Sequence, residues 1–342
     1  MTQNLKLGFA RIHELLRAME NESIDYPHLI SEYMEKDLLT LSKLFIHNSK
    51  IKNIIAVGEG IPELRLLISS TPNINVMLTA REFKKYRLPA SKYTELLPAY
   101  LLYRKVVEIT NCEMIYLSSI DLCDSIVAEY AEKKEKMISS HDFNHDIIQA
   151  SRVLATKYRV CPEHIHNVEY LTLKLFDHIR KIHGLGKRER LLLQIGIILH
   201  SCGAFVNINQ TRENSYKIIM STEIIGLSHR ERVMIANCVR YNSDLFPKFS
   251  ELSEELTRED YITTAKLCAL LKIGNVLDKS NRQKINDIRI MTKNNQLIIT
   301  AYTLADITLE KGLFERKADI FEEVFGLRPI LKQKRSEVNG EV

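Results

Sequence analysis

The feature that most constrains the fold is a dense series of helix start and stop signals between residues 140 and 283. Ser228-His-Arg-Glu231 is a capping box, in which serine and glutamate satisfy backbone N–H groups at a helix start. Thr257 is typical of a helix N-cap, and Gly184 stands where helices commonly end. Five helices joined by short connections predict an all-α domain over residues 138–285.

The middle helix of this series is apolar and carries a histidine at its C-terminal end. Between Leu191 and His200 the only polar side chain is that of Gln194, so we expect this helix to lie in the core. His200 is then either a hydrogen-bonded core residue, which we favour, or a metal ligand. Ser201 follows it, and serine offers no anionic oxygen to a hard divalent cation.

The N-terminal segment is of a different kind, because strands alternate with helices. Residues 54–57 predict a buried strand and residues 114–117 predict another. Further predictions are a short strand at residues 5–7 and an amphipathic helix over residues 26–47. We therefore expect residues 1–137 to form an α/β layer built on a small sheet.

The C-terminal segment, residues 286–335, predicts a small β-β-α-β unit. Two β-rich runs flank Lys293-Asn-Asn-Gln296, which is typical of a hairpin, and residues 313–325 have helical periodicity. A unit of this size rarely buries enough surface to be stable alone, so we expect it to pack on the helical domain. Residues 336–342 are expected to form a charged tail.

Gly58 and Gly60 follow the strand at residues 54–57 and form the one glycine pair of this segment that could approach a phosphate or nucleotide. A strand-to-helix turn requires glycines for its backbone geometry alone, and Glu59 would repel an anion there. We favour the geometric explanation and keep both residues as candidate phosphate-binding positions.

The composition sets broad limits. A formal net charge of +5 permits an anionic ligand without requiring nucleic acid. The six cysteines include no Cys-x-x-Cys pair, which favours reduced thiols in a cytosol over a zinc site or disulfides. No apolar run is long enough to span a bilayer, and the N-terminus lacks a signal-peptide pattern. We expect a cytoplasmic protein without a membrane partner.

Several motifs occur in a fixed order along nearly the whole chain. They include Leu5-Lys-Leu-Gly8, Ala56-Val-Gly58, Glu189-Arg-x-Leu-Leu, Arg232-x-x-x-Ile-Ala-x-x-Val-Arg-Tyr241 and Phe321-Glu-Glu-Val-Phe-Gly326. In this order they resemble the exopolyphosphatase and guanosine-pentaphosphate phosphatase (Ppx/GppA) family. The resemblance implies a partial second actin-like (ribonuclease H-like) lobe over residues 1–137 and an HD-like helical domain over residues 138–285.

The resemblance also implies an activity, the hydrolysis of phosphoanhydride bonds in polyphosphate or guanosine pentaphosphate with Mg²⁺. In that family the first lobe supplies an Asp-x-Gly phosphate loop and the catalytic glutamate. This sequence contains no Asp-x-Gly and no adjacent glycines. We therefore assign no catalytic residue, expect the chain alone to be inactive, and expect it to bind no Mg²⁺.

The family resemblance points to vestigial metal-ligand positions in the helical domain. His164 and His200 match the two histidines of the metal-binding version. Ser201 and Asn275 occupy its two aspartate positions, and Asp278 remains as one carboxylate. The loss of two carboxylates removes the main electrostatic reason for a divalent cation to bind.

Basic residues of the same domain are candidates for phosphate binding: Arg212, Lys217, Arg240 and Arg282. If they line one groove they form an anion track for polyphosphate or a guanosine polyphosphate, and otherwise they form a solvated basic face.

Two function classes therefore stay open. One is a Ppx/GppA-type phosphohydrolase, and the other is a non-catalytic module that binds such anions or a partner protein. A sheet edge near residue 5 predicts a homodimer.

Overall fold

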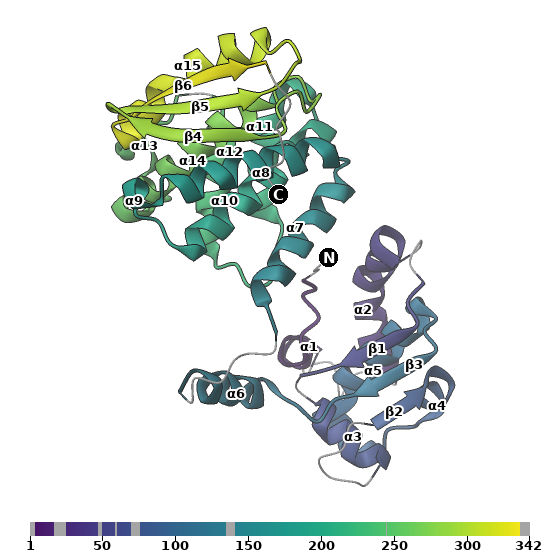
Figure 1. The fold of residues 1–342 in the computed structure, drawn as a ribbon. Helices are drawn as coiled ribbons and strands as arrows, with labels where there is room; N and C mark the ends of the chain where they lie inside the picture. The colour runs from purple at the N-terminus through teal and green to yellow at the C-terminus, as the bar shows by residue number, and fades with distance from the viewer. Residues whose placement is uncertain are drawn as a thin grey trace, which may run out of the picture. The chain divides into compact units, whose positions relative to one another are not determined.

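The computed structural model describes residues 4–16, 25–46, 50–58, 60–69, 76–134, 141–243 and 245–335. The chain divides into two compact units, Asn4–Ser140 and His141–Val342 (Figure 1). We call them the N-terminal unit and the C-terminal unit. Within the described ranges, none of the helices combines the length and the apolar character needed to cross a lipid bilayer.

The N-terminal unit is built on a three-stranded sheet in the order β1-β3-β2. β1 (Asn53–Ala56) runs parallel to β3 (Met114–Leu117), and β2 (Val76–Thr79) runs antiparallel to β3. The helices are α1 (Phe9–Leu16), α2 (Tyr26–Leu41) with a π-helical extension (Ser42–Ile46), α3 (Ile61–Ser69), α4 (Ala80–Lys85), α5 (Tyr93–Thr110) and α6 (Leu122–Lys134). A 3₁₀ turn (Ala90–Lys92) precedes α5.

One face of this sheet and the helices α2, α3, α4 and α5 share a core. Ile115 and Leu117 of β3 are fully buried in it, together with Phe83 of α4. The predicted strands at residues 54–57 and 114–117 are confirmed to within one residue. The assignment of this unit to an actin-like lobe stays a prediction.

The predicted strand at residues 5–7 is wrong. These residues pair with no strand, although Leu7 is buried in the core of the unit, and α1 begins two residues later. Two leucines that flank a lysine, at residues 5–7, favoured the prediction of a strand. A strand also needs a neighbouring strand with which to exchange backbone hydrogen bonds. The sheet edge that motivated the predicted homodimer is therefore not formed there, and the homodimer stays a prediction.

The C-terminal unit begins with a layer of packed helices. They are α7 (Phe143–Lys157), α8 (Pro162–His178), α9 (Arg180–His183), α10 (Lys187–Leu199), α11 (Thr211–Ser221), α12 (His229–Arg240), α13 (Phe249–Leu252) and α14 (Arg258–Leu277). Two 3₁₀ turns, Cys202–Phe205 and Ile208–Gln210, join α10 to α11. The predicted capping box at Ser228 and the N-cap at Thr257 are both present.

Two parts of this layer differ from the expectation. The predicted single helix that ends at Gly184 breaks at Ile179 into α8 and α9, and the imidazole of His183 contacts the carbonyl of Phe176 (2.8 Å). The polar segment around Arg212, for which no helix was predicted, forms α11, and this helix packs against α12.

A three-stranded sheet completes the C-terminal unit. β4 (Ile288–Lys293) pairs antiparallel with β5 (Gln296–Tyr302), and β5 pairs parallel with β6 (Arg328–Lys334). α15 (Thr308–Phe325) connects the last two strands and packs on α14 (Figure 1). Buried residues of the sheet, such as Ile299, belong to the same hydrophobic core as those of α10 and α14, so the helices and the sheet form one packed body.

Candidate functional site

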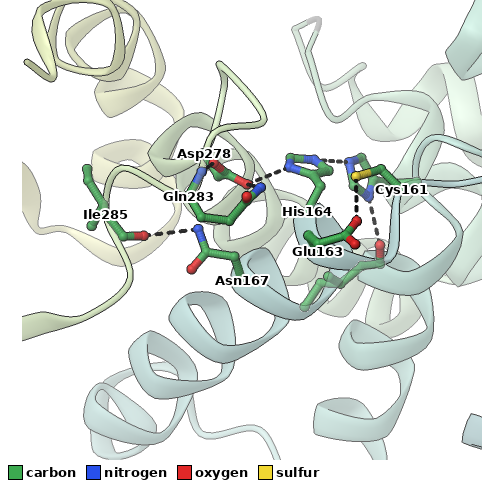
Figure 2. A network of polar contacts seen from close by, with 9 residues as sticks. Cys161, Glu163, His164, Asn167, Asp278, Gln283 and Ile285 are labelled. Carbon is green, nitrogen blue, oxygen red and sulfur yellow. Dashed lines mark hydrogen bonds and ion pairs between the residues drawn. The ribbon is translucent and has the colours of Figure 1, made fainter. Parts of the chain in front are cut away.

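Three helix ends of the C-terminal unit meet at one buried cluster (Figure 2). His164 lies in the first turn of α8, His200 is the C-cap of α10, and Asp278 is the C-cap of α14. All three side chains are buried. The structure therefore brings together three of the positions that the family resemblance singled out, although up to 114 residues separate them along the chain.

A close approach of α14 to α8 positions two members of the cluster. A Cβ atom on Gly274 would lie 1.7 Å from Oγ1 of Thr172, so only glycine allows α14 to lie this near to α8. Asn275 follows Gly274 directly and Asp278 comes four residues after it, so this close approach helps to hold Asp278 beside His164. A second tie joins α8 to the segment that follows α14, because Nδ2 of Asn167 on α8 donates to the carbonyl of Ile285 (3.0 Å).

Hydrogen bonds fix the orientation of both imidazoles. Nδ1 of His164 donates to Oδ2 of Asp278 (2.8 Å), and Nδ1 of His200 donates to the carbonyl of Ile197 (2.7 Å). The two Nε2 atoms then face each other at 3.3 Å. Since both rings donate through Nδ1, the two Nε2 atoms are both acceptors when the imidazoles are neutral, and they form no hydrogen bond to each other in that state.

The surroundings shift the pKa values of this cluster in definite directions. Burial, and then the neighbouring His164, lower the pKa of His200 from its ordinary 6.5 to about 4. For Asp278, burial alone would raise the pKa. The hydrogen bonds from His164 and Gln283 outweigh it, and they hold the carboxyl pKa below its usual value. Oδ1 of Asp278 accepts from the backbone N–H of Gln283 (2.8 Å).

The His200 shift predicts a loss of stability in mild acid. The unfolded chain binds a proton at this residue near pH 6.5, while the folded chain resists protonation until about pH 4. Stability should therefore fall as pH drops through this window, by about 3 kcal/mol in total. Urea unfolding of the protein and of His200→Asn at pH 7 and pH 4 measures it. The variant should lack this part of the pH dependence, and equal pH dependence in both proteins would contradict the assignment.

The buried cluster forms one wall of a cavity of about 780 Å³. The cavity is lined by Tyr158, Arg159, Val160, Cys161, His164, His200, Ser201, Ala204, Phe205, Ile208, Asn209, Thr211, Arg212, Asn242, Ser243, Asn275, Lys279 and Asn281. Three of these residues are cationic and none is an aspartate or glutamate. We call this space the anion cavity, after the charge of its lining.

Two observations indicate that Arg159, Lys279 and Asn242 of the anion cavity are available to a ligand. Arg159 and Lys279 are exposed and form no ion pair with any residue in the described ranges. Asn242 is 5% exposed, and its Oδ1 has no hydrogen-bond partner in the described part of the chain. A buried amide that lines a cavity without a partner is a group for a ligand or water to satisfy.

The predicted basic residues divide between the anion cavity and other places. Arg212 at the start of α11 lines the cavity. Arg240 instead donates to Glu213 (2.8 Å) and lies over the ring of Tyr216 (4.9 Å). Lys217 and Arg282 are exposed, and neither lines the cavity.

The donor set at the histidine pair does not fit Mg²⁺. This ion prefers oxygen ligands in near-octahedral geometry, whereas the cavity wall offers two imidazole nitrogens with the neutral side chains of Ser201 and Asn275. Both oxygens of Asp278 are engaged, by His164 and by Gln283. No group of three or more His, Cys, Asp or Glu within the described ranges could hold a metal ion.

Gly58 and Gly60 lie in the turn from β1 to α3 of the N-terminal unit. Both have left-handed backbone angles (φ 112° and 80°), and a Cβ on Gly60 would come within 3.2 Å of Cβ of Ala99. The turn therefore requires glycine at both positions for geometric reasons alone. Phosphate binding at this turn stays a prediction.

The sequence analysis did not predict Arg159 or Asn242 as ligand-binding residues. Arg159 has a left-handed backbone (φ 51°) in the connection from α7 to α8, and its guanidinium lies over the ring of Phe205 (5.9 Å). The available signal for Arg159 was a basic residue three positions before the proline that begins α8. Asn242 follows α12, and nothing in its local pattern marks it.

The C-terminal unit is thus a mainly helical domain with a basic cavity beside three helix ends. Residues 148–317 match the family model of the Ppx/GppA phosphatase, domain III. The chain belongs to the Ppx/GppA phosphatase family, of which it carries the C-terminal part. A comparison with curated proteins gives no match.

Proposed function

We propose that the protein binds linear polyphosphate in the anion cavity, as a Ppx/GppA-type protein that handles phosphoanhydride substrates. The observation that carries the proposal is the lining: it includes Arg159, Arg212 and Lys279, and no aspartate or glutamate of the described ranges belongs to it. Cations of this kind form charge-assisted hydrogen bonds to phosphate oxygens, which are roughly twice as strong as neutral ones. Family membership supports the same class of ligand.

The distribution of ion pairs supports the same location. Arg188, Arg190 and Arg240 of the C-terminal unit are each held by a carboxylate at 2.6 to 2.9 Å. A phosphate would have to displace that carboxylate, whereas Arg159 and Lys279 have none to displace. Among the described residues that line the cavity there is no carboxylate to act as a general base, so we assign to the cavity the binding of polyphosphate rather than its cleavage.

A second candidate ligand is a guanosine polyphosphate. Tyr158 and Phe205 both line the cavity, with their rings 5.7 Å apart in an edge-to-face arrangement. Phe205 is more than half exposed, so a nucleobase could stack on its ring in place of the Arg159 guanidinium while the phosphates reach Lys279. The cytoplasmic location and the absence of a specific nucleic-acid partner also stay predictions.

Titration calorimetry tests the proposal with three ligands: tripolyphosphate, guanosine tetraphosphate and guanosine. We expect heat from tripolyphosphate that weakens with added salt, and no heat from guanosine. Tighter binding of guanosine tetraphosphate than of tripolyphosphate would favour the second candidate. No heat from either phosphate ligand would refute both. Assays of phosphate release with Mg²⁺ on the same samples test the expectation that the isolated chain does not cleave tripolyphosphate.

A further inference from the structure

A second basic hollow lies in the N-terminal unit. It has a volume of about 510 Å³ and is formed where β2 leads into α4, beside the start of β3. It is lined by Thr79, Ala80, Arg81, Lys84, Lys85, Arg87, Asn111, Cys112 and Glu113. Four of these nine residues are basic and one is acidic. We call this space the α4 hollow.

The sequence of α4 places the basic residues together. Arg81, Lys84 and Lys85 have the spacing of neighbours on one side of a helix, three and four residues apart. Arg87 follows the helix, and its Nη1 donates to the carbonyl of Lys84 (3.1 Å), which keeps its guanidinium near the same helix end. The four cations therefore border one space rather than pointing in four directions.

The charge of the α4 hollow is not neutralised within the described ranges. The one acidic residue of α4, Glu82, is bound by the backbone N–H and the hydroxyl of Thr79 (2.8 and 2.7 Å) in a capping box. None of the four basic residues forms an ion pair with a described residue. On α5 of the same unit, by contrast, Arg104 and Lys105 both contact Glu108 (3.4 and 3.7 Å).

The lining of the α4 hollow also indicates how a ligand would be recognised. It contains no aromatic ring. The nearest tyrosine in sequence, Tyr86, packs against Tyr100 instead (6.2 Å between ring centres). A nucleotide base would find no surface on which to stack, whereas phosphate oxygens would meet several cations at once.

We propose that the α4 hollow is a second binding site for a linear phosphate chain. The class of ligand rests on the proposed function of the anion cavity, but the site itself stands on different residues in a different unit. A protein with two such sites on one chain should bind long polyphosphate more tightly than tripolyphosphate, because the second contact forms at a high effective concentration.

The test uses the full chain and two double variants. Arg81→Gln with Lys85→Gln removes two exposed cations of the α4 hollow, and Arg159→Ala with Lys279→Ala removes two from the anion cavity. Lys36→Gln with Lys50→Gln is the matched control, since it removes the same charge from exposed positions outside both sites. Thermal unfolding checks that each variant is folded.

Calorimetry with tripolyphosphate should give two sites in the parent protein and in the control. Each site variant should retain one site and weaken the other about tenfold or more. For long-chain polyphosphate, the α4 variant should also lower the slope of log affinity against log salt by about one for each cation removed.

The outcomes distinguish the proposal for the α4 hollow from the proposed function of the anion cavity. If the parent binds at one site, and only the anion-cavity variant weakens it, the α4 proposal is refuted and the proposed function stands. If only the α4 variant weakens binding, the anion cavity loses its assignment. If a single-stranded oligonucleotide of equal charge binds the α4 site as tightly as polyphosphate, the assignment to a base-free phosphate chain is wrong.

Discussion

Reversal of charge in Lys279→Glu is expected to weaken tripolyphosphate binding at the anion cavity by about a hundredfold. Lys279 is exposed, lines the cavity directly after Asp278, and has no ion pair in the described ranges. The variant loses a charge-assisted hydrogen bond and places a carboxylate beside the phosphates. Together these changes cost about 3 kcal/mol, which is about a hundredfold in affinity.

Arg240→Ala is the control for this prediction. It also removes a cation from the C-terminal unit, but this cation is bound to Glu213 and lies outside the cavity. Tripolyphosphate affinity should stay within about twofold of the parent, while stability falls by about 1 kcal/mol through the lost ion pair and ring contact. Weakening by Arg240→Ala as large as that by Lys279→Glu would contradict the assignment of the binding site to the cavity.

Gly203→Ala is expected to destabilise the protein by about 3 kcal/mol or more. A Cβ on Gly203 would lie 2.1 Å from the carbonyl oxygen of Thr211 and 2.3 Å from the backbone nitrogen of Ser215. Both are backbone atoms of α11, so the 3₁₀ turn and the helix would have to move apart. The backbone N–H of Gly203 also donates to Oγ of Ser215 (2.9 Å), and that bond would be lost as they separate. Urea unfolding at pH 7 measures the change.

A second glycine provides the control for the first. Gly312 lies inside α15, and a Cβ there would meet nothing within 4 Å. Gly312→Ala should therefore stabilise the protein by about 0.5–1 kcal/mol, because alanine loses less conformational freedom on folding. If both variants changed stability by the same amount, the close approach of the turn to α11 would not be a structural requirement.

The elements that could be predicted from the sequence are those whose signals are local. The capping boxes at Thr79 and Ser228 both form, since each needs only residues three apart. The strand β3 was predicted with its bounds, because a short apolar run between turn residues is sufficient to mark it. The strand β2 was missed, since its four residues have no alternation that separates them from the capping box that follows.

Part of the candidate site could be predicted from the sequence. The part that could not depends on contacts between residues far apart in the chain. The family resemblance indicated His164, His200 and Asp278, which the structure brings into contact. Spacing could not show that Arg240 is bound by Glu213, 27 residues earlier, because that ion pair depends on how α11 packs on α12. Asn242 was missed for the same reason, since only the tertiary fold reveals that it is buried.

The packing of the C-terminal sheet on the helices has a consequence for synthesis. Asn275 of the cavity lining lies on α14, α14 packs on α15, and α15 connects β5 to β6, which pair in parallel. We therefore expect the cavity to be absent from a nascent chain until β6 has left the ribosome. In a cell that contains polyphosphate, this site would be present only on chains in which β6 has been synthesised. Ribosome-bound intermediates that end before Arg328 should not bind polyphosphate at this site.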